Sequence, residues 1–276
     1  MVLEQYAGPF RPTLLQGARA ISQQLKGLGV DVPPLDFIMD AIVITAVLLL
    51  LSLLFIPLRS KDKRDTLLLV GISGESDSPS VGKTSLFTVL RDGVFPKYGT
   101  VPSMQPNQAQ IWLPATNLLV NLVDYPGHPR LLYKLTEHLS RAKGIVFVVD
   151  GEMFTAQARR DAALLHDVLT NPVVANKATP VLIFINKTDA QKCAKEATVK
   201  VRLQAELDRV RTASASRLRS VGAEGKEEGE EERAFLGFEN EAFCFEHAAS
   251  PVSIASGSAQ ELDVEGILEF ARSHFL

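Results

Sequence analysis

The chain has 276 residues, of which 46% are hydrophobic and 22% charged, and its 29 Lys and Arg residues nearly balance its 32 Asp and Glu residues. This composition excludes a wholly disordered or collagen-like chain, and two cysteines exclude a disulfide-stapled framework. The formal net charge of -3 argues against direct nucleic acid binding, because no excess of basic residues is present to neutralise phosphates.

An apolar segment near the N-terminus, residues 37–58, is long enough to span a bilayer as one helix. Between Ala41 and Ile56 its only polar side chains are those of Thr45 and Ser52. A buried core helix or a cleavable signal peptide would also be apolar. The run has no polar stripe, however, and it starts too far into the chain for a signal peptide. We therefore predict a single transmembrane helix.

The charges that flank this segment predict its orientation. Four basic residues lie in the linker 59–65, whereas the nearest N-terminal flank carries one lysine and three aspartates. Because Lys and Arg concentrate on the cytosolic side of membrane proteins, we expect segment 1–36 to be lumenal and the domain 66–276 to be cytosolic.

Short apolar runs recur in the C-terminal part, with the pattern of parallel strands that are buried on both faces. They are Thr66–Val70, Leu118–Val123, Gly144–Val149, Val181–Ile185 and Val252–Ala255. Helical spacing of apolar residues appears between them, at Leu132–Leu139 and Val199–Val210. Strands that alternate with helices predict an α/β domain around a mostly parallel sheet.

Two segments depart from this pattern. Gln108–Leu113 alternates polar and apolar residues and is closed by Pro114, which predicts an edge strand that pairs antiparallel. Residues 214–234 include the Gly- and Glu-rich run Glu224–Arg233, which has no apolar side chain. We predict a disordered surface loop there.

A phosphate-binding loop is indicated where the first strand ends. Gly71 follows the strand, and Gly82-Lys83-Thr84-Ser85 opens the next predicted helix. In such a loop, backbone amides and a helix N-terminus surround the phosphates, Lys83 contacts the β- and γ-phosphates, and the Thr84 hydroxyl binds Mg²⁺. Gly-Lys-Thr alone could equally be a surface turn, so this interpretation depends on the rest of the chain.

The predicted loop is longer than usual. Ten residues separate Gly71 from Gly82, where a phosphate-binding loop has four. Without Glu75–Ser80 the match would be complete, so these six residues either bulge away from the nucleotide or come from a mispredicted splice site. They also carry two carboxylates, which would bring negative charge toward the phosphates.

Residues that suit a guanine nucleotide follow three later strands. After the second run, Asp124 can hold Mg²⁺ through water, and Gly127 can present its amide to a γ-phosphate. The fourth run is followed by Asn186-Lys187-Thr188-Asp189. The Asp189 carboxylate can accept hydrogen bonds from the guanine N1–H and 2-amino group, which adenine lacks, while the Lys187 stem covers the base. The last run is followed by Ser258 and Ala259, whose backbone can meet the guanine oxygen.

These four motifs, in this order and each behind a predicted strand, resemble those of the Ras-like small GTPases. The chain more closely resembles the family formed by the β subunits of the signal recognition particle receptor, over roughly residues 34–276, including the N-terminal anchor. The resemblance implies a Ras-like domain that binds GTP and Mg²⁺. Gly99–Asn107 is similar to switch I of Arf proteins, which implies that Mg²⁺ is held by Thr84, Ser103 and Asp124, with Thr100 as the alternative to Ser103.

One residue departs from the pattern of Ras-type enzymes. His128 follows Gly127, where those enzymes have the Gln that orients the attacking water. His128 is therefore the candidate catalytic residue of at most a slow GTPase, and its alternative role is that of an ordinary surface histidine.

The resemblance implies a single-pass protein of the endoplasmic reticulum membrane. Its GTP-bound form would tether the α subunit of the signal recognition particle receptor for co-translational protein targeting. An alternative is an Arf- or Sar-like GTPase that cycles to recruit a vesicle coat, although a permanent membrane helix argues against such cycling. A third hypothesis is a scaffold that no longer binds nucleotide, because of the long loop.

Overall fold

The computed structural model describes residues 64–73, 80–114, 116, 118–220, 235–238 and 241–275, together with Thr45. Apart from Thr45, these residues belong to the unit Lys63–Leu276. Of the predicted span 37–58, only Thr45 is among the described residues. Residues 75–79 of the long loop and residues 221–234 of the predicted surface loop also lie outside the described part. Within the described part, no helix combines the length and hydrophobicity that a membrane span needs.

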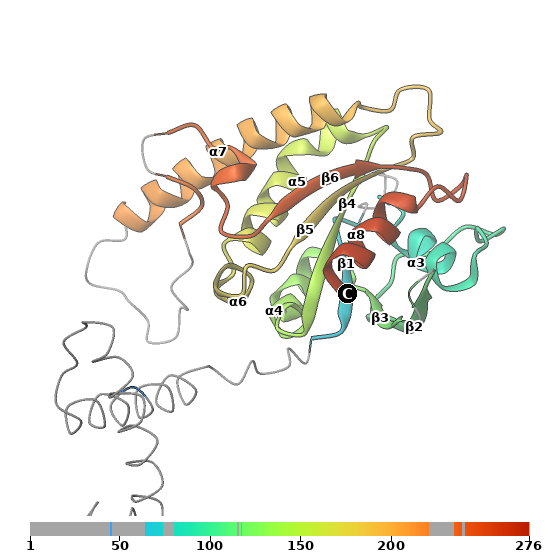
Figure 1. Cartoon of the computed structure of the whole chain (residues 1–276). Coiled ribbons are helices and arrows are strands. Elements are labelled where there is room, and N and C mark those ends of the chain that lie inside the picture. The colour runs from blue at the N-terminus through green and yellow to red at the C-terminus, as the bar shows by residue number, and fades with distance from the viewer. Residues whose placement is uncertain are drawn as a thin grey trace, which may run out of the picture. The chain divides into compact units, whose positions relative to one another are not determined.

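The described strands form a sheet of six, in the order β2-β3-β1-β4-β5-β6 (Figure 1). Their bounds are β1 Thr66–Val70, β2 Asn107–Leu113, β3 Leu118–Asp124, β4 Ala142–Asp150, β5 Val181–Asn186 and β6 Val252–Ser256. β2 is antiparallel to β3, and all other neighbours are parallel. The prediction of a mostly parallel sheet with an antiparallel edge strand is therefore confirmed.

Burial explains why the strands could be recognised in the sequence. β1 and β5 are buried along their whole length, as expected of parallel strands with helices on both faces. β2 instead alternates exposed and less exposed residues along its first half, as expected at an edge.

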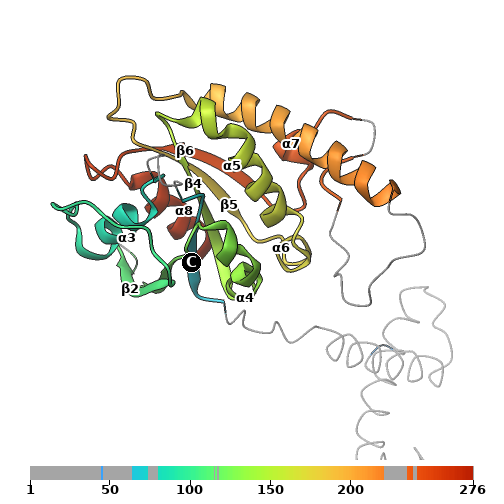
Figure 2. The same ribbon diagram turned by 180° about the vertical axis from the view of Figure 1, so that it is seen from behind.

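Helices cover both faces of the sheet. The longer ones are α3 Lys83–Asp92, α5 Phe154–Leu169, α7 Glu196–Ser220 and α8 Glu265–Phe275, and the short ones are α4 Leu135–Leu139, α6 Pro172–Asn176 and the 3₁₀ helices η1 Pro129–Lys134 and η3 Phe245–His247. α3 and α8 pack on one face, and α4, α5, α6 and α7 pack on the other. α8 lies in front of the sheet in Figure 1, and α4 and α5 lie in front of it in Figure 2.

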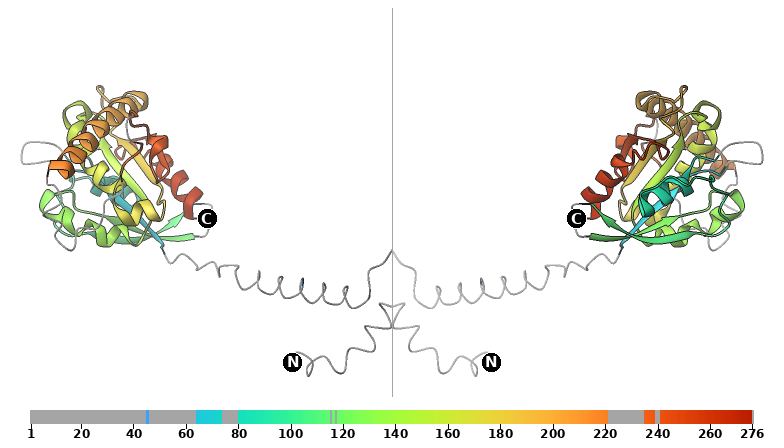
Figure 3. Two further views of the ribbon diagram at one scale, coloured as in Figure 1. Left: turned by 90° about the vertical axis from the view of Figure 1, so that its left-hand side faces the viewer. Right: turned by 90° about the vertical axis from the view of Figure 1, so that its right-hand side faces the viewer.

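Each face of the sheet has its own hydrophobic core. In the side views the strands lie between α7, in orange, and α8, in red (Figure 3). In β4, Ile145 and Phe147 point into the core under α5 and α7, while Val146 and Val148 point into the core under α8. Alternate side chains of one buried strand thus join two layers of helices, which makes the sheet a rigid platform for the loops at its edge.

Two expectations about helices differ from the structure. Leu132–Leu139 forms the end of a 3₁₀ helix followed by a five-residue α-helix rather than one α-helix. α7 continues to Ser220, so the first seven residues of the predicted loop 214–234 are helical. Alanine, arginine and leucine are good helix formers, and the preceding helix is already nucleated.

Candidate functional site

The predicted site residues lie at one edge of the sheet. β1, β3, β4, β5 and β6 are parallel, so their C-terminal ends share this edge, which we call the carboxyl edge. The loops that leave these strands contain all four predicted motifs, and α3 begins there at Lys83. Ligands of open α/β sheets bind at this position.

The N-terminus of α3 is shaped by Gly82. Gly82 has φ 84°, in the left-handed region, and a Cβ atom on it would lie 2.4 Å from Asn186 Nδ2. Lys83 is buried, and its Nζ donates a hydrogen bond to the carbonyl oxygen of Gly71 at 2.8 Å. Burial lowers the pKa of Lys83 to about 8, although Asp124 and Asp161 raise it. The ammonium group is therefore held against the predicted phosphate loop, as a phosphate ligand would need.

Three oxygen-bearing side chains meet beside Lys83. The Thr84 hydroxyl donates to Asp124 Oδ2 at 2.7 Å, and Thr84 Oγ1 lies 3.3 Å from Ser103 Oγ. Thr100 Oγ1 lies instead 3.5 Å from Ser85 Oγ. Of the two switch I alternatives, the structure thus brings Ser103 to Thr84 and Asp124.

Asp124 has the properties of a cation ligand. Its side chain is 1% exposed, and its Oδ1 has no hydrogen-bond partner within the described part of the chain. Burial raises the pKa of Asp124, and the hydrogen bond from Thr84 and the charge of Lys83 partly offset this effect. A buried acceptor without a partner is costly, and a cation would satisfy it. Because Mg²⁺ prefers oxygen ligands, Thr84, Ser103 and Asp124 fit this ion.

Asn107 belongs to this cluster, although the sequence analysis gave it no role. Its Nδ2 donates to Ser103 Oγ at 3.0 Å and to Asp124 Oδ2 at 3.2 Å. Asn107 is the first residue of β2 and lies opposite Asp124 in the β2–β3 register. The predicted antiparallel edge strand indicated that this segment pairs with a neighbouring strand. The register that places Asn107 opposite Asp124 was not predicted.

Gly127 packs directly against the predicted phosphate loop. Its carbonyl oxygen accepts a hydrogen bond from the amide of Ser73 at 3.1 Å. A Cβ atom at this position would lie 2.1 Å from the Gly71 carbonyl oxygen and 2.4 Å from the Ser73 nitrogen. Only glycine fits here, and any side chain would displace the backbone of residues 71–73.

His128 follows Gly127, and its side chain contacts the start of η1. Its side chain is exposed, and its Nδ1 accepts a hydrogen bond from the amide of Arg130 at 3.2 Å, at the start of η1. This contact is a helix cap. The catalytic role of His128 stays a prediction.

The predicted base-binding residues are joined by hydrogen bonds. Asn186 Nδ2 donates to the Val81 carbonyl at 2.9 Å, and Asn186 Oδ1 accepts from the Ala259 amide at 3.1 Å. The Ser258 hydroxyl donates to Asp189 Oδ1 at 2.5 Å. Asn186 thus ties the loop before α3 to the loop after β6, and Ser258 orients the carboxylate of Asp189.

Lys187 contacts a residue that the sequence analysis did not select. Its Nζ lies 2.6 Å from Asp150 Oδ2, at the end of β4. The position of Asp150 could have indicated a role at this edge, because it is a carboxylate directly after the buried run Gly144–Val149.

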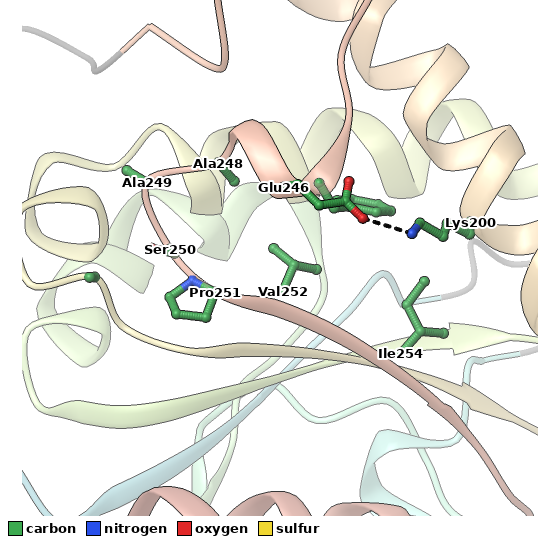
Figure 4. A pocket seen from close by; sticks show the side chains of 10 residues that line it. Lys200, Glu246, Ala248, Ala249, Ser250, Pro251, Val252 and Ile254 are labelled. Carbon is green, nitrogen blue, oxygen red and sulfur yellow. Dashed lines mark hydrogen bonds and ion pairs between the residues drawn. The ribbon is translucent and has the colours of Figure 1, made fainter.

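Two of the hollows on the described surface differ in the chemistry of their lining. The smaller is lined by Lys83, Thr84, Ser103, Asp124 and Gly127, among others. The larger lies beside β6 and is mostly apolar, with the ion pair Lys200–Glu246 at its rim, at 2.9 Å (Figure 4). None of the predicted site residues lines the larger hollow. We therefore place the candidate nucleotide site at the smaller one, on the carboxyl edge.

Comparisons with known proteins agree with this geometry. The family model of the signal recognition particle receptor beta subunit matches residues 62–252. The receptor subunit beta of Dictyostelium discoideum is 31% identical over 180 residues, which cover 65% of this chain and 60% of the relative. That of Saccharomyces cerevisiae is 33% identical over 154 residues, which cover 51% and 61%. The chain thus spans about three fifths of the length of these two relatives.

Solved structures show the same fold. The mammalian SRP receptor structure matches with a TM-score of 0.63 and 24% identity, over 75% of this chain and 98% of the other. The structure described as SRb-GDP-Mg from Chaetomium thermophilum matches with a TM-score of 0.54 and 22% identity, over 77% and 98%.

Proposed function

This chain belongs to the family of signal recognition particle receptor beta subunits, and from this premise we propose that it is a membrane-anchored guanine nucleotide-binding protein. In this proposal its GTP-bound form docks the receptor's alpha subunit at the endoplasmic reticulum membrane. The relatives carry the receptor subunit name, and one similar structure is described as an SRb-GTP/SRX complex.

The main support for the nucleotide site is the buried Oδ1 of Asp124, which has no hydrogen-bond partner among the described residues. The other carboxylate oxygen of Asp124 accepts the hydrogen bond from Thr84. A site for a nucleotide with its Mg²⁺ explains the Oδ1 atom. A related structure described as SRb-GDP-Mg supports the proposal.

In the proposed site, each group of residues has one task. Lys83 and the amides at the start of α3 bind the phosphates, because a helix N-terminus and a buried ammonium group favour negative charge. Thr84, Ser103 and Asp124 hold Mg²⁺, Asp124 through water. When bound, Mg²⁺ neutralises negative charge on the phosphates.

The guanine base is bound at the other end of the carboxyl edge. Asp189 accepts hydrogen bonds from the base, and the hydroxyl of Ser258 holds its carboxylate in place. Asn186 keeps the loops before α3 and after β6 together, so the base and phosphate sites stay at a constant separation. The backbone near Ala259 meets the guanine oxygen.

The partner surface would be the segment that carries Ser103. Tyr98, Val101 and Met104 are exposed apolar side chains of this segment. If Ser103 binds the metal, the nucleotide state would determine the conformation of this segment and of its exposed side chains. A partner that binds one of these conformations would therefore distinguish the GTP-bound state. Hydrolysis is at most slow in this proposal, because no described residue other than His128 takes the place of the Gln of Ras-type enzymes.

Capture of the receptor alpha subunit's N-terminal region on GTP- and GDP-loaded protein tests this proposal. We expect capture in the GTP state, and we expect Ser103→Ala to reduce it severalfold through the lost metal ligand. Thr100→Ala tests the alternative ligand and should reduce capture less than Ser103→Ala, because Thr100 contacts Ser85 instead. Equal capture in both nucleotide states would make the protein a constitutive tether and contradict the switch.

A further inference from the structure

We infer that Asp150 is a positioning residue for base recognition, which holds Lys187 so that the lysine stem can cover the guanine. This inference rests on the proposed function and deepens it, because it assigns a role at the base site to a residue outside the four motifs. Three features of the structure carry it: the contacts of Asp150, the backbone of Lys187 and the exposure of the two side chains.

The carboxylate of Asp150 is held in one orientation. Its Oδ1 accepts hydrogen bonds from the amides of Glu152 and Met153 at 3.0 and 3.1 Å, and its Oδ2 lies 2.6 Å from Lys187 Nζ. The side chain is fully buried. A buried carboxylate needs such partners, and with both oxygens engaged it cannot turn away from Lys187.

Lys187 has an unusual backbone. Its φ is 68°, in the left-handed region, which is unfavourable for a residue with a Cβ atom. The preceding residue, Asn186, lies opposite Asp150 in the β4–β5 register, and the Gly151 amide donates to its carbonyl at 2.9 Å. The end of β4 therefore supports the turn that Lys187 forms, and the ion pair with Asp150 offsets its strain.

Exposure shows which part of Lys187 is left for a ligand. The Lys187 side chain is 26% exposed although its partner Asp150 is fully buried. Its ammonium group is thus anchored inward, and part of its side chain stays at the surface. Two residues later, Asp189 is held by Ser258. The two base-binding side chains are each fixed by a residue from another loop, so little freedom is lost when a base binds.

Loss of Asp150 should weaken guanine nucleotide binding. Without the carboxylate, the lysine would lose its anchor, and ordering it on binding would cost affinity. We expect Asp150→Asn to bind GTP and GDP about tenfold more weakly, by the same factor for both, because the base and not the phosphates is affected. Asn retains an oxygen that accepts the two amide hydrogen bonds.

The experiment is a competition titration of the full-length protein against fluorescent GDP, with GTP and GDP as competitors. Glu152→Gln is the matched control, because it removes an exposed carboxylate from the same turn and should leave both affinities unchanged. Lys187→Met keeps most of the stem but lacks the ammonium group, so it should reproduce the tenfold loss. Unchanged affinity in this variant would overturn the inference even if Asp150→Asn does not fold.

Combining the two substitutions separates positioning from a general structural role. In the Lys187→Met background, Asp150→Asn should change affinity by less than about twofold. Three results would overturn this inference while leaving the proposed function intact. They are unchanged affinity in the single variant Asp150→Asn, a full tenfold loss from Asp150→Asn in the Lys187→Met background, and a loss that differs between GTP and GDP. If the unmodified chain binds neither nucleotide, the proposed function fails and takes this inference with it.

Discussion

Asp124 and Asn107 show how single residues shape the proposed metal site. Asp124 lies at the end of a buried strand, where the sequence pattern already indicated a ligand. Asn107 lies across from it and donates to both Asp124 and Ser103. Such outer partners orient the ligands of a metal and raise its affinity. Asn107 therefore connects the switch segment to the sheet.

The role of Asn107 leads to a prediction for the metal affinity. Asn107→Ala should weaken Mg²⁺-dependent retention of nucleotide about tenfold, because Ser103 and Asp124 lose their shared donor. Nucleotide dissociation rates over a range of Mg²⁺ concentrations measure this effect. Gln110→Ala removes a cross-strand hydrogen bond of the same strand, to Asn121, and serves as the control. Equal Mg²⁺ dependence in both variants would separate Asn107 from the metal site.

At the scale of elements, the strands were predictable and the contacts between loops were not. The five buried runs are strands whose ends differ from the prediction by at most two residues, because burial on both faces requires a continuous apolar run. The hydrogen bond of Asn107 to Asp124 and the pairing of Asp150 with Lys187 depend on how segments far apart in the chain come together. No local pattern encodes these contacts.

Helix α5 carries a feature that its sequence pattern does not explain. Asp161 is fully buried, and neither of its carboxylate oxygens has a hydrogen-bond partner among the described residues. Burial, with a smaller contribution from Asp150, raises the pKa of Asp161 to about 7. The folded state therefore keeps a proton on this carboxylate at pH values where the unfolded chain has released it. Asp161 accordingly destabilises the fold as pH rises from about 4 to 7.

Replacement of Asp161 should make this effect visible. We expect Asp161→Asn to raise the free energy of unfolding by about 1–3 kcal/mol more at pH 8 than at pH 5, since the amide carries no charge to bury. Denaturant unfolding at the two pH values measures the difference. Asp167→Asn is the control on the same helix, where the side chain is 54% exposed. A gain that is the same at both pH values would contradict this account of Asp161.

In the described domain, the length of the parallel strands separates the proposed nucleotide site from Arg64, the first described residue of this unit. The linker enters at Arg64, whose guanidinium donates to the Ala142 carbonyl and the Thr179 hydroxyl, at the N-terminal ends of β1, β4 and β5. The proposed nucleotide site lies at the carboxyl edge, at the other ends of these strands.

The central claim is that the carboxyl edge binds a guanine nucleotide, and base selectivity tests it most directly. The measurement is equilibrium binding of GTP and xanthosine triphosphate to the full-length protein and to Asp189→Asn. Ser258 donates to Asp189 Oδ1, so an asparagine accepting that bond would turn its amide hydrogens toward the base. These hydrogens match the oxygen that replaces the guanine 2-amino group in xanthine.

We expect the unmodified protein to bind one GTP per chain and to bind xanthosine triphosphate poorly. Asp189→Asn should reverse this preference, because the amide donates where the carboxylate accepted. Unchanged GTP affinity in the variant, with no gain in xanthosine triphosphate binding, would contradict the account by removing Asp189 from the base site.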